Sequence, residues 1–568
     1  MITYYNAIDL NDFYTYEEWG MIIDFDSNVK SRISFGFTFI EQRLQQLVSS
    51  NSEIMLNINR EKGFFRIATI RNTTDVKWQQ YRMESDRTIT RLTNGILPFK
   101  EFSNSLVTVI ATVDKGYAII YGNKTTDQTP TLLSLLFILH IKYNQISVAS
   151  LSIYQTSVLN LTFILVSCNI VTIGVGHVCI LTVNLKDPMG LQPDEISYVK
   201  INFLSSGLTL SSKVINRLFP IIENTNLLGL DWQVNDLPFG GYLLTNSSAP
   251  TTNGTIIYGY LFDEDDSNYL AWALDEPQQS NVRGTFFVLP HNNTLMMAQP
   301  EIDNGWSFKI IGLPKFIGDR DKGYSNANIE ATLPGIQTSI DSDTQKTVTI
   351  NFYEPVNLSS GNISIYQVNV DRPPSLRQIT SGNLCSLDND GKTVVVKILD
   401  GTFSIPNGNY YIKVDNNFVK NKEYNESLLG IRENVWNFNT TEGKKETFAA
   451  SAIVLLRLTT NGTKYYDGLT SVGKKVFFDT LLSELADSVP ISVKRFHSNN
   501  RVMPDKNSKD QYLISVDIEE SKDGNERGVE SVIKIIDSMV RNKEQTPIGS
   551  GSVTKYLDAT FGFTPVRK

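Results

Sequence analysis

Short runs of alternating apolar and polar residues recur along the first 325 residues of the chain, separated by Gly, Asn and Asp. Alternation with a period of two is typical of strands that bury one face. Residues 1–325 are too many for one ordinary sandwich. We therefore expect an all-β, propeller-like domain, with stacked β-sandwiches as the alternative. The clearest runs are 20–24, 63–70, 106–112, 116–121, 255–261, 269–274 and 284–289.

Weak internal repeats accompany these runs. Asp114-Lys-Gly-Tyr117 returns as Asp321-Lys-Gly-Tyr324, and the Leu-Pro-Phe of residues 97–99 returns at 237–239. Such short matches are also ordinary turn sequences, so they add little to the propeller hypothesis.

Two more apolar stretches lie within the same region. The run 132–141 is too short to span a bilayer, and we interpret it as a buried strand or helix. The runs 161–168 and 178–183 predict two buried strands.

Residues 328–442 show the patterning of a β-sandwich. Val348, Ile350 and Phe352 alternate toward one face, and Pro355 ends that strand because it lacks a backbone donor. Trp436 and Phe438, two residues apart, are expected to anchor the core from the last strand.

The order of motifs in this stretch resembles the bacterial-type Ig-like domain of S-layer proteins, the SbsA-like family. The resemblance implies a β-sandwich that serves as an extracellular spacer or display module without catalysis. The loop 421–433 is longer than the Gly-Asn turn usual in that family. The whole chain also resembles large, Asn-rich fungal surface proteins that carry this module. The matching residues are Phe352, Pro355, Val356, Gly408, Tyr410, Asp415, Phe418, Val419, Lys420, Trp436, Phe438 and Thr440.

Residues 446–568 change from strand to mixed periodicity. We predict strands at 452–458, 491–496, 512–518 and 556–561, with one helix capped by Ser471 and a second over 529–540. This βαββαβ order is that of a ferredoxin-like α+β domain. It is similar to extracellular SEA-type domains. The loop 497–510 lacks the Gly-Ser pair of their self-cleaving members, so we expect no autoproteolysis.

The net charge argues against one class of partner, and the cysteines offer one disulfide candidate. The net charge is −8 and no Lys/Arg-rich cluster occurs, which argues against a nucleic-acid partner. Cys168 and Cys179 flank a possible hairpin and are a disulfide candidate, with two small buried side chains as the alternative. Cys385 is expected to be a core residue.

Asn-x-Ser/Thr sequons indicate a secreted or cell-surface glycoprotein. We read the chain as a fragment of a longer type I membrane protein, with a signal sequence and a membrane anchor outside it. The expected partner is another protein or a cell-wall glycan. The candidate glycosylation sites are Asn72, Asn123, Asn160, Asn246, Asn253, Asn292, Asn357, Asn362, Asn425, Asn439 and Asn461.

Residues that could carry chemistry are scattered. His140, His177, His291 and His497 form no recognisable triad or zinc motif, and the acidic loop 262–268 lacks the Gly and Glu of a calcium-binding loop. We therefore expect no catalytic residue, metal or cofactor. The favoured function is a non-catalytic surface protein. The alternative is a secreted carbohydrate-active hydrolase with an accessory Ig-like domain, because its two carboxylates need not be close in sequence.

Overall fold

The computed structural model divides the chain into two compact units. Unit 1 comprises Met1–Asp321 and Tyr424–Leu429, and unit 2 comprises Lys322–Glu423 and Gly430–Lys568. The structure describes residues 2–566 with gaps at 8–15, 24–28, 38–41, 44–45, 48–51, 70–74, 85–87, 98–106, 125–133, 147–149, 157–160, 186–194, 216–230, 248–254, 264–268, 271–277, 281–285, 290–292, 301–305, 343, 370–371, 442–450 and 522–525.

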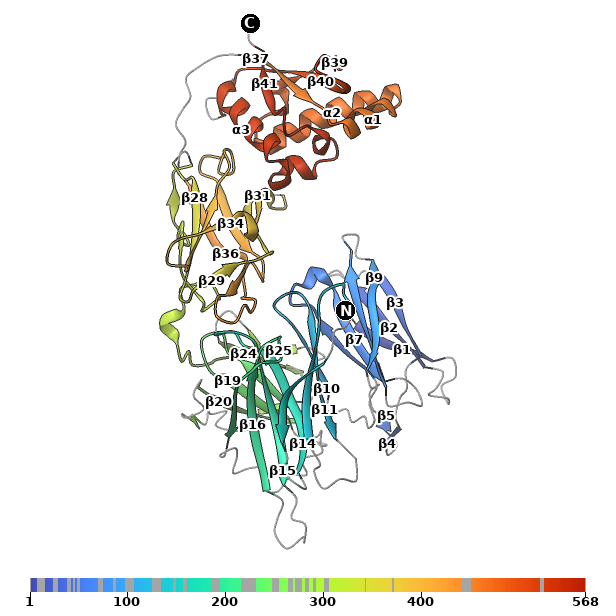
Figure 1. Cartoon of the computed structure of the whole chain (residues 1–568), viewed down its shortest axis with the longest axis vertical. Coiled ribbons are helices and arrows are strands. Elements are labelled where there is room, and N and C mark those ends of the chain that lie inside the picture. The colour runs from blue at the N-terminus through green and yellow to red at the C-terminus, as the bar shows by residue number, and fades with distance from the viewer. Residues whose placement is uncertain are drawn as a thin grey trace. The chain divides into compact units, whose positions relative to one another are not determined.

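Unit 1 is built from consecutive antiparallel sheets, as the alternating sequence runs predict (Figure 1). Each sheet joins strands that follow one another in sequence, except that β22 pairs with β20. The sheets are β1 (Ile2–Ala7), β2 (Tyr16–Ile23) and β3 (Val29–Phe37); β6 (Ser52–Leu56), β7 (Phe64–Thr69), β8 (Val76–Met83) and β9 (Ile89–Leu97); β10 (Val107–Ala111), β11 (Tyr117–Lys124), β12 (Ser134–Ile141) and β13 (Leu151–Thr156); β14 (Leu161–Ile170), β15 (His177–Leu185), β16 (Glu195–Phe203) and β17 (Thr209–Ile215); β18 (Asp231–Asp236), β19 (Tyr242–Ser247), β20 (Thr255–Phe262), β21 (Tyr269–Leu270) and β22 (Gln278–Ser280); and β23 (Phe286–Leu289), β24 (Thr294–Pro300) and β25 (Trp306–Gly312). A short pair, β4 (Gln42–Arg43) and β5 (Gln46–Leu47), stands apart.

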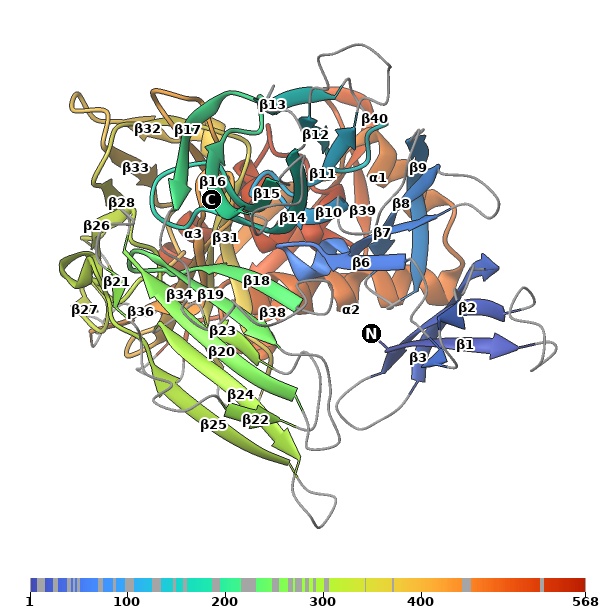
Figure 2. The ribbon, with the colours of Figure 1, turned by 90° about the horizontal axis from the view of Figure 1, so that it is seen from below.

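The first strands of successive sheets contact one another. β6 contacts β10, β10 contacts β14, and β14 contacts β18. Two apolar clusters fill the spaces between these sheets, one between the β6 and β10 sheets and one between the β10 and β14 sheets. In Figure 2, neighbouring strands lie side by side within the β6 sheet and, separately, within the β18 sheet. First strands that lie innermost are typical of propeller blades. The prediction of a mainly β fold is confirmed.

A glycine followed by a ring begins the second strand in four successive blades. The pairs are Gly63-Phe64, Gly116-Tyr117, Gly176-His177 and Gly241-Tyr242. A Cβ on each glycine would meet a carbonyl oxygen of the third strand, so only glycine allows the approach. The four ring residues lie opposite Tyr81, Ile141, Phe203 and Phe262 on that third strand. This is the repeat of the domain, and the Asp321-Lys-Gly-Tyr324 match does not belong to it because it lies at the unit boundary.

The apolar stretches of the sequence find clear places in these sheets. Residues 132–141 supply strand β12, which pairs with β11 and β13 and buries Leu136, Ile138 and Ile141 completely. Of the two earlier alternatives, strand is therefore correct and helix is wrong. The two buried strands predicted at 161–168 and 178–183 are β14 and β15.

Unit 2 begins with two sheets that face one another as a sandwich. Trp436 is fully buried between them, and its Nε1 donates to the Pro334 carbonyl at 2.8 Å. Thr440 is also buried and accepts from the backbone N–H of Gly408 at 2.9 Å. One sheet holds β26 (Ile329–Leu333), β28 (Thr347–Phe352), β33 (Thr393–Lys397) and β32 (Ser386–Leu387); the other holds β27 (Ser339–Ile340), β36 (Ile431–Thr440), β34 (Asn409–Val414), β30 (Asn362–Gln367) and β31 (Ser375–Ser381); and β29 (Val356–Leu358) pairs with β35 (Val419–Asn421).

The rest of unit 2 is an α/β domain whose sheet has the order β38–β40–β37–β41, with all neighbours antiparallel. This is the neighbour order of a split βαβ sandwich. The helices pack on the sheet through one apolar cluster, which includes Val454, Phe477, Leu481, Ile514 and Val532. The elements are β37 (Ala452–Arg457), α1 (Thr460–Asp467), α2 (Ser471–Ser488), β38 (Phe496–His497), β39 (Val502–Asp505), β40 (Ser508–Ile518), α3 (Val529–Arg541) and β41 (Phe563–Pro565).

Local details of this domain correct the sequence-based expectations. The cap of α2 is Thr470, whose side chain accepts from Gly473 N, and not Ser471. The expected strand at 491–496 is mostly a 3₁₀ turn, η8 (Val493–Arg495), which places Arg495 against Glu519 and Glu526. The expected strand at 556–561 begins instead at Phe563, because Asp558 and Thr560 bond one another in a turn. Helix α1 was not predicted.

Candidate functional site

The hairpin tips that follow the first strands of unit 1 are linked by hydrogen bonds from blade to blade. Buried Asn57, after β6, donates from Nδ2 to the Lys115 carbonyl, after β10, at 2.8 Å. Thr172, after β14, donates from its backbone N–H to Asp236 at the end of β18 at 2.6 Å. Because these tips meet, the first strands end at one common end of the blades and begin at the opposite end.

Two histidines, His140 and His177, lie at this linked end, and the contacts of each are those of a structural residue. His140 Nε2 lies 3.3 Å from Asp114 Oδ2. Burial raises the pKa of Asp114, but the hydrogen bond to His140 and those from Thr112 and Gly116 outweigh it and hold that pKa below its ordinary value. Burial, helped by the nearby His140, lowers the pKa of His177 to about 3, so that side chain is neutral at physiological pH.

His177 contacts a serine, but the pair does not have the geometry of a catalytic triad. His177 Nε2 lies 3.1 Å from Ser205 Oγ, and Ser205 Oγ itself donates to Glu426. In a triad the carboxylate holds the second ring nitrogen of the histidine. Here His177 Nδ1 is buried without a hydrogen-bond partner, so nothing orients the ring as a base.

At the opposite end of the first strands lies Glu53, the second residue of β6. Burial raises the pKa of Glu53 to about 7, although a hydrogen bond from the backbone N–H of Val109 works in the other direction. Val109 belongs to β10, the first strand of the next blade. The Glu53 carboxyl therefore reaches the inner edge of the neighbouring blade. Near neutral pH about half of the molecules carry this carboxyl in its protonated form.

Sequence reasoning missed Glu53, although a signal was present. In the strand Ser-Glu-Ile-Met-Leu, Glu53 and Met55 point to the same face, and Met55 packs against the apolar cluster between the β6 and β10 sheets. A carboxyl on the core-facing side of a strand is costly unless its environment changes its pKa. Ionisable groups with strongly shifted pKa values are common at functional sites.

Cys168, Cys179 and the acidic loop belong to unit 1, and Cys385 belongs to unit 2. Cys168 of β14 lies opposite Cys179 of β15, and their sulfurs form a disulfide with an S–S distance of 1.92 Å. Cys385 is free and half-buried, and burial raises the pKa of its thiol to about 11. Of the acidic loop, Asp265 and Asp266 lie outside the described residues. Across the residues that are described, no group of three or more His, Cys, Asp or Glu side chains could hold a metal ion.

The candidate glycosylation sites have different surroundings. Asn425 and Asn461 are exposed, and Asn357, Asn362 and Asn439 are half-buried. Asn123 and Asn246 lie in β11 and β19, and their side chains are not described. Asn72, Asn160, Asn253 and Asn292 lie outside the described residues. In the described part of the chain, no helix combines the length and apolarity needed to cross a bilayer.

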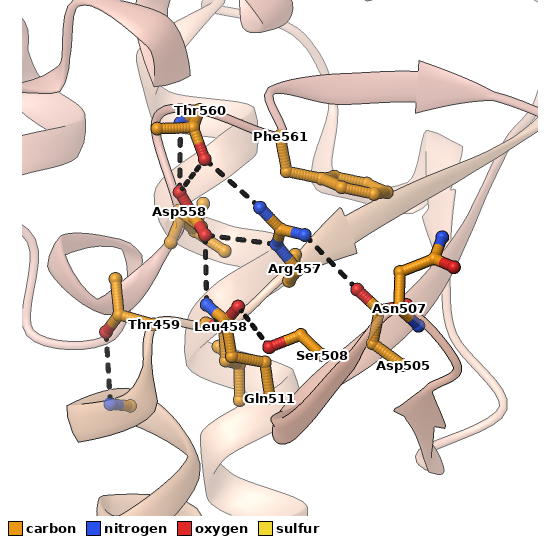
Figure 3. Close-up of polar contacts among 12 residues, drawn as sticks. Arg457, Leu458, Thr459, Asp505, Asn507, Ser508, Gln511, Asp558, Thr560 and Phe561 are labelled. Atoms are coloured by element: carbon orange, nitrogen blue, oxygen red, sulfur yellow. Dashed lines mark hydrogen bonds and ion pairs between the residues drawn. The ribbon is translucent and has the colours of Figure 1, made fainter.

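A second polar centre lies in the α/β domain around Arg457 (Figure 3). Arg457 Nε bonds Asp558 Oδ2 at 3.0 Å, Nη1 bonds Asp505 Oδ2 at 3.2 Å, and Nη2 bonds Thr560 Oγ1 at 3.1 Å. The Phe561 ring lies 5.0 Å from the guanidinium carbon. Asp558 also accepts from Gln511 Nε2 at 2.9 Å. These groups satisfy one another, so the network fastens β37, β40 and the 558–561 turn together.

A carboxylate on α2 fastens the 549–554 loop in a similar way. Glu484 accepts from the backbone N–H groups of Ser552 at 2.7 Å, Val553 at 3.1 Å and Thr554 at 2.8 Å, and from the hydroxyls of Ser552 and Thr554. Burial raises the pKa of Glu484, but these hydrogen bonds outweigh it and hold the pKa below its ordinary value. The 549–554 loop thus surrounds the Glu484 carboxylate of α2.

Replacing Glu484 by Gln is expected to lower the stability of this domain by about 1–3 kcal/mol, because an amide group cannot accept from five donors. The folded pKa is depressed, so the carboxylate stabilises the fold above the ordinary pKa and that contribution is lost as the pH falls through the folded value. Urea unfolding should show a larger difference between the two proteins at pH 7 than at pH 3. Asp487→Asn, an exposed change on the same helix, is the control. An equal difference at both pH values would contradict the argument.

No protein-family model and no curated protein matches this chain. Among solved structures it is similar to the alpha-L-arabinanase of Penicillium chrysogenum, with 9% identity, 52% of this chain and 85% of that chain covered, and a TM-score of 0.31. It is also similar to an alpha-L-arabinofuranosidase of Podospora anserina (13% identity, 46% and 89% covered, TM-score 0.26) and to a xylan beta-1,4-xylosidase of Bacillus halodurans (8% identity, 69% and 92% covered, TM-score 0.27). All three are glycoside hydrolases, and they contradict the expectation that this chain is not an enzyme.

Proposed function

We propose that unit 1 is a carbohydrate-active hydrolase that cleaves a glycosidic bond, with Glu53 as its proton donor. The observation that carries the proposal is the Glu53 carboxyl, which lies on the innermost strand of a blade and has a pKa raised to about 7. A general acid works best when its pKa is near the working pH, because it is then protonated and still donates readily. Glu53 meets that requirement without a metal or cofactor.

Hydrolysis of a glycosidic bond needs a second carboxyl group, either as base or as nucleophile. In the proposed mechanism, Glu53 gives its proton to the leaving oxygen, and the second carboxyl group activates a water molecule or attacks the sugar carbon.

The remaining features fit a secreted enzyme with an accessory unit. A disulfide such as Cys168–Cys179 persists in oxidising compartments, which supports an extracellular location. We propose that the SbsA-like sandwich and the α/β domain of unit 2 carry the hydrolase rather than catalyse. Exposed Asn425 and Asn461 are the sequons that we expect to be glycosylated.

The test is a hydrolysis screen of the whole chain against arabinan, xylan, cellulose and inulin, together with aryl glycosides of the matching sugars. We expect release of reducing ends from at least one of them, with a rate that falls as the pH rises through about 7, because deprotonated Glu53 has no proton to give. Activity that is flat between pH 5 and 9, or no activity on any substrate, would overturn the proposal.

A further inference from the structure

A pocket of about 290 Å³ lies inside unit 2, between the sandwich and the start of α3. Its walls come from the 398–403 connection between β33 and β34, from Ser342, Gln345 and Lys346 before β28, and from residues between 527 and 535. The volume is several times the roughly 30 Å³ that one water occupies, so the pocket has room for a small ligand.

The charged side chains of this pocket are mostly cationic. Lys346 Nζ lies 3.4 Å from Asp400 Oδ1, and Lys534 Nζ lies 3.6 Å from Asp400 Oδ2. Arg527 also lines the pocket, and its Nε donates to the Ser404 carbonyl at 3.0 Å. The lining thus carries three cationic side chains and one carboxylate, and the two lysines share that carboxylate. Both lysine side chains are largely exposed, which leaves their ammonium groups able to turn toward a ligand.

A fourth cation is buried directly behind the pocket wall. Arg377 is only 1% exposed, and its Nη2 donates to the Gly401 carbonyl and to Ser404 Oγ, both at 3.0 Å. Its Nε has no hydrogen-bond partner, and in the described part of the chain no carboxylate pairs with it. A buried guanidinium without a counter-charge is costly, and a nearby anion would relieve that cost. The positive potential of the pocket is therefore larger than its lining alone suggests.

We infer that this pocket binds an oxyanion, held by Lys346, Lys534 and the guanidinium of Arg527. Charge-assisted N–H···O bonds from ammonium and guanidinium groups are the strong ones, and guanidinium groups suit planar carboxylates as well as sulfate and phosphate. The anion is either the acidic group of a saccharide or a free inorganic ion. The inference does not depend on hydrolysis by unit 1.

The experiment is isothermal titration calorimetry on the whole chain, with sodium sulfate and with galacturonate as separate probes and the ionic strength held constant. Lys346→Gln and Lys534→Gln are each expected to weaken binding about tenfold, the loss of one charge-assisted bond. Lys475→Gln removes the same charge from an exposed position on α2, outside the pocket, and should leave binding unchanged.

The two probes distinguish the sources of the anion. Binding of galacturonate but not of sulfate supports an acidic saccharide, and binding of sulfate at similar strength supports a free inorganic anion. The inference is overturned if neither probe binds. It is equally overturned if Lys475→Gln weakens binding as much as the pocket variants do, because the attraction is then only the general charge of the surface.

Discussion

Replacement of Glu53 by Gln is expected to lower the hydrolysis rate about 10²- to 10⁴-fold, the usual contribution of a positioned general acid. The amide has nearly the same shape as the acid, so it keeps a partner for the Val109 N–H but cannot give up a proton. The rate of the variant should also lose the fall near pH 7 that the wild type shows. Both are read from initial rates over pH 5 to 9 on the substrate found by the screen.

The stability of the same variant separates catalysis from folding. Burial favours the protonated form of Glu53, so the folded chain binds more protons than the unfolded chain, and stability falls as the pH rises toward about 7. Glu53→Gln removes this penalty, so at pH 8 its melting temperature should equal or exceed that of the wild type. Glu61→Gln, an exposed change in the adjoining hairpin, should alter neither rate nor stability. If Glu53→Gln keeps the wild-type rate, Glu53 is not the acid.

Replacement of Arg457 by Met is expected to destabilise the α/β domain by about 3 kcal/mol. Asp505 and Asp558 would remain mostly buried without their counter-charge, and losing one partner of a buried pair is among the costliest changes in a protein. The Phe561 ring would also lose the cation it covers (Figure 3). Hydrogen exchange of the β37 and β40 amides in the whole chain should speed up about 100-fold, because this side chain holds β37 to β39 and to the 558–561 turn, which Gln511 of β40 also contacts.

Two further variants, a control and a rescue, test the Arg457 prediction. Arg501→Met removes a charge from an exposed position in the same domain and should leave exchange unchanged. Adding Asp505→Asn and Asp558→Asn to Arg457→Met removes the unpaired charges and should recover part of the protection. Unchanged exchange in Arg457→Met alone would show that the network contributes little to stability.

The α/β domain shows where local signals mislead. Thr459 caps α1 by accepting from Gly462 N, yet Asn461-Gly-Thr463 looks like a turn in sequence. Gly462 is required there because a Cβ would lie 2.7 Å from the Tyr556 side chain, a residue far along the chain. The glycine within α1 is therefore explained by tertiary packing that its own sequence does not disclose.

The sequence by itself determined the elements whose signal is local. Period-two alternation identified strands such as β7, β10 and β11, and the spacing of Trp436 and Phe438 identified two core anchors of the sandwich. These succeed because the pleat of a strand fixes which side chains share a face. For Cys168 and Cys179 the sequence left a disulfide and two separate buried side chains as alternatives, and the structure pairs the two residues in a disulfide.

Only the tertiary structure decided which charged groups matter. Burial in the folded blades raises the pKa of Glu53, and Arg377 becomes an isolated buried charge because the sandwich closes around it. The pocket walls bring together residues far apart in sequence, such as Lys346 and Lys534. Desolvation and the distances between charges depend on residues remote in sequence, and no local pattern encodes them.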